Sequence, residues 1–108
     1  MSNMQQLTPL PQEPLLIYAS REFDGFTYQL DPSSFRRVRH ALGDDARQFP
    51  RIFISYDVKE DFEKLVGPTK RELVLLLTGL SAEQVAQLGG VEFRDPNTDQ
   101  PLFLWRSA

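Results

Sequence analysis

Short apolar runs separated by turn-forming residues predict a β-hairpin near the beginning of the chain. Residues 15–19 (LLIYA) and 26–30 (FTYQL) are rich in β-branched and aromatic residues, the composition that strands prefer. Asp24-Gly25 lies between the two runs and is typical of a tight turn. A further run of this kind, 51–56 (RIFISY), predicts a third strand.

Asp31 and Pro32 predict the start of a helix directly after the second run. An aspartate can accept hydrogen bonds from the free N–H groups of the first turn, and a proline at the first helical position loses no hydrogen bond. Gly43 can adopt the left-handed conformation that ends many helices. The apolar positions between these signals share one helix face: Phe35, Val38, Ala41 and Leu42.

Three further helix starts share a capping-box signal, in which an oxygen-bearing side chain precedes Glu or Gln by three positions. The pairs are Asp57 with Glu60, Thr69 with Glu72, and Ser81 with Gln84. We therefore expect helices over 57–66, 69–80 and 81–88. The run 73–77 (LVLLL) also suits a buried strand, and the helical spacing of its leucines favours the helix.

The last part of the chain predicts a second hairpin, because the runs 91–94 (VEFR) and 102–106 (LFLWR) flank the turn-rich segment DPNTDQP. Residues 1–14, with their prolines and glutamines, predict a flexible N-terminal tail. We expect residues 15–108 to form a single small α+β domain. In it, a mostly antiparallel sheet of about five strands carries about three or four helices packed on one face.

The composition argues against an enzyme and predicts no catalytic residue, no metal site and no cofactor. The absence of cysteine excludes disulfides, thiol nucleophiles and cysteine zinc sites. The single histidine, His40, excludes multi-histidine metal sites, and it falls near the solvent side of its predicted helix. The acidic residues match no calcium loop. A carboxylate enzyme is a third hypothesis, which requires an enclosed pocket with two perturbed acids.

Charge and hydropathy bear on the location and the partner of the protein. The start of the chain lacks the basic residues and the apolar run of a signal peptide, and no apolar stretch approaches the roughly 20 residues of a membrane helix. We therefore expect a cytoplasmic protein with no membrane partner. The net charge of −3 disfavours non-specific binding to nucleic acid, which needs a local basic patch.

The densest positive feature is the segment 35–40 (FRRVRH), and we predict Arg36, Arg37 and Arg39 as partner-binding residues. Guanidinium groups bind carboxylates and phosphates through paired hydrogen bonds, which fits an acidic protein surface or a nucleic-acid backbone. A solvated helix face without a partner is the alternative.

Phe103 and Trp105 are predicted as further partner-binding residues. They share one face of the last strand, whereas Leu102 and Leu104 share the other, so this strand is apolar on both sides. Such a strand at a sheet edge can recruit a partner protein, or a second copy of the chain to give a homodimer. Burial of one face beneath the helices is the alternative.

Residues 69–88 (TKRELVLLLTGLSAEQVAQL) resemble the first two helices of a helix-turn-helix unit of the LuxR type, in which a T-x-R-E start and a G-L-S turn recur. The resemblance implies a DNA-binding transcriptional regulator. In that family a recognition helix follows, whereas this chain continues with GGVEFRDPNTDQP, in which Pro96 and the acidic residues disfavour a helix. DNA binding is therefore the alternative. Our leading hypothesis is a non-enzymatic protein-binding module of the inhibitor, immunity factor, adaptor or chaperone type.

Overall fold

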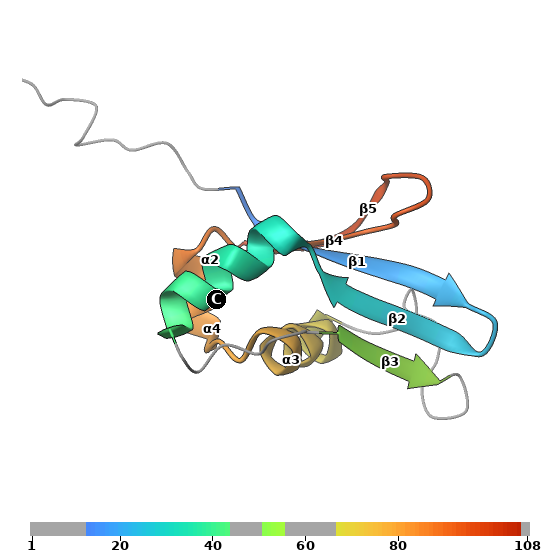
Figure 1. Cartoon of the computed structure of the whole chain (residues 1–108), viewed down its shortest axis with the longest axis horizontal. Coiled ribbons are helices and arrows are strands. Elements are labelled where there is room, and N and C mark those ends of the chain that lie inside the picture. The colour runs from blue at the N-terminus through green and yellow to red at the C-terminus, as the bar shows by residue number, and fades with distance from the viewer. Residues whose placement is uncertain (1–12, 44–50, 56–66, 107–108) are drawn as a thin grey trace, which may run out of the picture.

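The computed structural model of the chain describes residues 13–43, 51–55 and 67–106. Its strands are β1 (Leu15–Glu22), β2 (Gly25–Leu30), β3 (Arg51–Ser55), β4 (Val91–Arg94) and β5 (Pro101–Trp105), and its helices are α2 (Pro32–Leu42), α3 (Gly67–Thr78) and α4 (Ala82–Gln87). These elements form one small α+β domain, which confirms the predicted fold class (Figure 1). The helix predicted over 57–66 and most of the predicted tail lie outside the described residues.

The five strands form one sheet in the order β3-β2-β1-β4-β5. β1 pairs antiparallel with β2, β2 with β3, and β4 with β5, so the sheet is mostly antiparallel, as predicted. The central pair of β1 with β4 is parallel, which makes the sheet mixed. Parallel strands need a long connection, because the chain must return to the end of the sheet from which the first strand started. The connection from β1 to β4 includes α2, α3 and α4. In Figure 1, α2 and α4 lie at the left, and α3 lies next to α4 toward the centre.

The core lies on one face of the sheet, beneath the helices. Side chains alternate along each strand, and the register places Ile17 of β1 beside Leu30 of β2 and Phe93 of β4. The helices cover these residues with apolar side chains, so that strands and helices share one buried cluster. Its helical members are Val38, Leu73, Val74, Leu77 and Val85. Positions on the opposite sheet face, such as Phe53 and Leu104, are about half exposed.

Local signals fix both ends of α2. The Asp31 carboxylate accepts hydrogen bonds from the N–H groups of Ser33 and Ser34, and Pro32 is the first helical residue. Gly43 ends the helix with a φ of 65°, a conformation that costs glycine little. All three signals were readable in the sequence because they act within a few residues of one another.

The two later helices confirm a second set of predictions. Residues 67–78 are helical, so the LVLLL run forms part of a helix rather than a strand. The predicted start at Thr69 is wrong, because α3 begins at Gly67 and position 69 lies inside the helix. Ser81 accepts a hydrogen bond from the N–H of Gln84, whose side chain accepts one from the N–H of Ser81. This reciprocal pair is the predicted capping box, and it starts α4 immediately after the turn that ends α3.

Both predicted hairpins are present, and the first turn lies one residue earlier than expected. β1 and β2 extend to Glu22 and Gly25, so Phe23 and Asp24 form the turn. The end of β1 is charged and exposed, and it therefore lacks the apolar signal of a strand. Gly25 belongs to β2 through its pairing with Glu22 and Ser55. The position requires glycine because a Cβ atom there would collide with the carbonyl oxygen of Ile54 on β3. β4 and β5 form the second hairpin.

Candidate functional site

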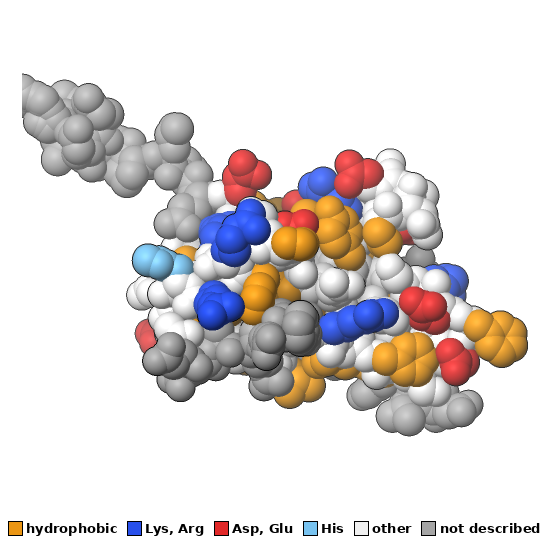
Figure 2. All heavy atoms as spheres, viewed as in Figure 1, with side chains coloured by type: hydrophobic (Ala, Val, Ile, Leu, Met, Phe, Trp, Pro, Cys, Tyr) orange, Lys and Arg blue, Asp and Glu red, His pale blue; other side chains and the backbone are white. Residues whose placement is uncertain are grey.

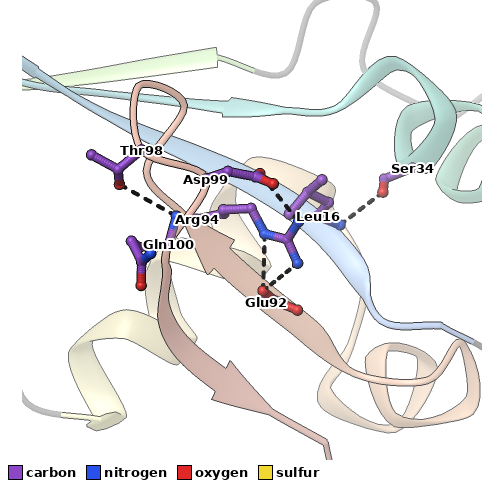
Figure 3. A network of polar contacts seen from close by, with 7 residues as sticks. All are labelled: Leu16, Ser34, Glu92, Arg94, Thr98, Asp99 and Gln100. Atoms are coloured by element: carbon purple, nitrogen blue, oxygen red, sulfur yellow. Dashed lines mark hydrogen bonds and ion pairs between the residues drawn. The ribbon is translucent and has the colours of Figure 1, made fainter.

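Contacts on the inner face of α2 fix this helix to the sheet. Ser34 is buried, and its hydroxyl oxygen accepts a hydrogen bond of 2.7 Å from the backbone N–H of Leu16 on β1 (Figure 3). The pairing of β1 with β2 ends at Ile17 and Leu30, so β2 offers no carbonyl oxygen to the N–H of Leu16. The Ser34 hydroxyl takes the place of that acceptor. Val38, one helical turn further, is buried in the core. These two contacts set the rotation of α2 and direct its other face outward.

Arg37 is held at the side of α2 by backbone carbonyl groups. One guanidinium nitrogen donates a hydrogen bond of 2.7 Å to the carbonyl oxygen of Glu13, and another donates to the carbonyl oxygen of Leu88. The side chain thus links α2 to the segment before β1 and to the C-terminal end of α4. A cation is favourable at that end, where the last carbonyl groups lack helical partners. Arg37 therefore has a structural role, and partner binding by this residue stays a prediction.

The exposed residues Arg36, Arg39 and His40 form what we call the basic face of α2. Figure 2 shows Lys and Arg side chains gathered with the histidine over this helix. Arg36 and His40 line a shallow hollow of about 410 Å³, together with Ser33, Arg37 and Leu88. Neither Arg36 nor Arg39 forms a hydrogen bond or an ion pair within the described part of the chain. Their guanidinium groups can therefore bind a ligand without breaking a contact to any of the described residues.

The aromatic residues predicted as a binding surface on the last strand lie against the core. Trp105 is 3% exposed, and the guanidinium carbon of Arg71 on α3 lies 5.4 Å from the centre of its ring. Phe103 is half-buried, with its ring centre 6.1 Å from that of Phe93. The exposed apolar residue of this strand is Leu104. β5 does lie at the sheet edge, but its inner face is turned toward α3, and neither Phe103 nor Trp105 lines the hollow of α2.

A polar network on the other sheet face neutralises Arg94. This side chain donates hydrogen bonds of 2.7 and 3.1 Å to the carboxylate of Glu92 and one of 3.2 Å to that of Asp99 (Figure 3). The hydrogen bond with Glu92, and then that with Asp99, raises the pKa of Arg94 above its ordinary value. The network links β4 to the turn that leads to β5. Arg94 is therefore not part of the basic face.

A second hollow, which the sequence did not predict, lies at the turn between β1 and β2. It has a volume of about 590 Å³ and is lined by Glu22, Phe23, Asp24, Thr27, Arg51 and Phe53. Phe23 is 100% exposed and Phe53 is 48% exposed. The one sequence signal was a bulky aromatic residue next to Asp24-Gly25, where small or polar residues are usual. The pairing of β2 with β3 is what brings Phe53 to the same place.

The described residues contain no other group that suggests chemistry. Within them, no three His, Asp or Glu side chains come together to hold a metal ion. Every buried polar side-chain atom in the same part of the chain has a hydrogen-bond partner. None of the helices described is both long enough and apolar enough to cross a membrane.

The helical pair that resembles a helix-turn-helix unit serves as a cover for the sheet. α3 and α4 are joined through Gly79, which has a φ of 77°. Leu73 and Leu77 of α3 are buried in the core cluster. Where the family has a recognition helix, this chain has β4, which pairs with β1. DNA binding stays an untested alternative, and the recognition helix that would support it is replaced by β4.

Three comparisons with known proteins found no match to this chain, whether against protein-family models, curated proteins or solved structures.

Proposed function

We propose that the protein is a non-enzymatic protein-binding module, of the inhibitor, immunity factor, adaptor or chaperone type, which binds an acidic segment of a partner protein through the basic face of α2. The observation that carries this proposal is the contrast between neighbouring arginines. Arg37 is held by two backbone carbonyl groups, whereas Arg36 and Arg39 are exposed and have no such contacts in the described chain.

The chemistry of the basic face favours carboxylates. A guanidinium group binds a carboxylate through two parallel hydrogen bonds, and these bonds are stronger than those between neutral groups. Arg36 and His40 are four positions apart and line the same hollow, so a bound acidic side chain would contact both. Because the chain as a whole has a net charge of −3, this face is a local feature that orients a partner.

The way α2 is held supports recognition by a rigid surface. The helix has an aspartate cap at its start, a buried Ser34 contact to β1 and the Arg37 contacts at its side. A surface that is already ordered loses little conformational entropy on binding. The arginine side chains themselves still have to be ordered, which costs about 1 kcal/mol each.

Stabilisation of α2 itself is the simplest competing role for the two arginines of the basic face. Arg39 lies in the last turn, where positive charge interacts favourably with the helix dipole. Arg36 lies near the middle of the helix and gains little from that effect. Arg36 therefore separates the two roles, because its replacement should affect binding much more than stability.

The test is capture of partners by the tagged full-length chain at low salt, with both protein and nucleic acid measured. Arg36→Glu and Arg39→Glu are compared with Arg21→Glu, a reversal of the same charge on β1 near the β1–β2 turn. We expect the unmodified chain and Arg21→Glu to capture one protein partner in stoichiometric amount. Arg36→Glu should capture at least about tenfold less of this partner.

Two results would contradict the proposal. Equal capture by all three variants would remove the basic face from recognition. Recovery of nucleic acid in place of a protein, lost as salt rises, would favour the DNA-binding regulator. Thermal unfolding of each variant separates lost binding from lost folding.

A further inference from the structure

The two edges of the sheet differ in how they are protected. β3 and β5 are the outer strands. β5 begins at Pro101, and its pairing with β4 shifts register between Phe93 and Arg94. Proline and irregular pairing are devices by which natural sheets prevent contact between edges. β3 pairs with β2 over five consecutive residues without a shift and contains no proline. Among the described elements, β3 therefore has the regular, unprotected edge.

The backbone of Phe53 is directed to this edge. β1 and β2 are joined by a two-residue turn, so the flanking pair of Glu22 and Gly25 exchanges hydrogen bonds between these two strands. Alternation along β2 then turns the N–H and C=O groups of Phe26 toward β3, where its partner is Ile54. The same alternation along β3 turns the N–H and C=O groups of Phe53 outward. Phe53 is also the middle residue of its strand.

The side chain of Phe53 makes the edge apolar. Its ring lies over Gly25, with the Cζ atom 2.8 Å from the point that a Cβ of residue 25 would occupy. About half of the residue, 48%, is still exposed, and the turn residue Phe23 is 100% exposed. Figure 2 shows hydrophobic and acidic side chains together at the right end of the molecule, over this turn and β3. An exposed aromatic side chain beside an unprotected edge favours association.

The charges around this edge are complementary to themselves. Arg51 lies at the start of β3, whereas Glu22 and Asp24 lie at the turn, near the end of β3. All three side chains are exposed, and none forms an ion pair within the residues described. In an antiparallel pair of β3 strands with Phe53 at its centre, Arg51 of each copy comes opposite Ser55 of the other and points toward that copy's acidic turn. The arrangement therefore brings opposite charges together twice.

We propose that the chain forms a two-fold dimer in which β3 pairs antiparallel with β3 of a second copy, and Phe53 packs against Phe53. The dimer uses a surface separate from the basic face of α2 and does not depend on the function proposed above. A pair of five-residue strands is small compared with the interfaces of permanent dimers. The dimer is therefore reversible and forms at micromolar or higher concentration.

Sedimentation velocity of the full-length chain over a wide concentration range tests the surface. We expect the mass to rise from monomer to dimer, and Phe53→Asp to raise the dissociation constant at least about tenfold, because like charges then meet at the centre of the pair. Leu104→Asp is the matched control on the other edge strand, where the leucine is 53% exposed. Leu104→Asp and Arg36→Glu should leave the dissociation constant unchanged. Thermal unfolding checks that each variant folds.

A charge exchange tests the orientation of the two copies. Arg51→Glu and Glu22→Arg should each weaken the dimer of its own kind, because each variant brings like charges together. A mixture of the two variants should associate better than either alone, because both opposite-charge contacts are restored. A monomer at every concentration would overturn the proposal. So would dissociation by Leu104→Asp but not by Phe53→Asp, or a mixture that associates no better than its components.

Discussion

Replacement of Arg37 by alanine should destabilise the fold, whereas replacement of Arg36 on the same helix should not. Arg37 donates hydrogen bonds to the carbonyl groups of Glu13 and Leu88. Hydrogen bonds of charged groups contribute about 1.5–3 kcal/mol each when they are buried. Arg37 is partly exposed, and water can reach the two carbonyl groups once the side chain is removed. We therefore expect a loss of about 1–2 kcal/mol in the free energy of unfolding, compared with at most about 0.5 kcal/mol for Arg36→Ala.

Urea unfolding monitored by tryptophan fluorescence measures this difference directly. The chain has one tryptophan, Trp105, and its burial at 3% exposure makes its emission sensitive to unfolding. The midpoint should fall for Arg37→Ala with an unchanged dependence on urea. In thermal unfolding, the same loss corresponds to a decrease of roughly 4–10 °C for a domain of this size. The urea midpoint of Arg37→Lys should lie between those of the unmodified chain and Arg37→Ala, because an ammonium group cannot bridge both carbonyl groups as a guanidinium group does. Equal midpoints for Arg37→Ala and Arg36→Ala would refute the anchoring role.

Two further substitutions test the core and a helix cap. Phe93 is fully buried and packs edge-on against Tyr28 with 6.1 Å between ring centres, so Phe93→Ala should cost about 3–5 kcal/mol. Calorimetry should show a large decrease in the melting temperature of Phe93→Ala, and the melting temperature of Phe93→Leu should lie between those of Phe93→Ala and the unmodified chain. A loss below about 1 kcal/mol in the free energy of unfolding of Phe93→Ala would contradict this packing. Ser81→Ala removes the cap of α4 and should cost about 1 kcal/mol in urea unfolding. No loss from that change would show that the capping box is not needed for α4.

The sequence by itself determined several of the helix ends of this protein. The cap at Asp31, the stop at Gly43 and the capping box of Ser81 with Gln84 were all predicted and are all present. Each acts through hydrogen bonds or backbone conformations that involve neighbouring residues, so no knowledge of the rest of the fold was needed. The helical identity of the LVLLL run followed from the spacing of its leucines in the same way.

The tertiary structure decided which side chains became available for function. Leu102 to Trp105 are apolar at every position, so alternation alone did not show which face of the last strand was inward, and packing beneath α3 buries Trp105. Arg37 was indistinguishable from its neighbours until the fold placed the carbonyl group of Leu88 beside it, 51 residues away in sequence.

The strand order and the hollow at the β1–β2 turn also depend on long-range contacts. β1 pairs with β4 although most of the chain separates them. The pairing of Thr27 with Phe53 brings Phe53 into the same hollow as Phe23. Hydrophobic patterning indicates which segments form strands and helices but not which strands become neighbours. Neighbours are selected by packing in three dimensions, and this selection placed β3 and β5 at the two edges of the sheet.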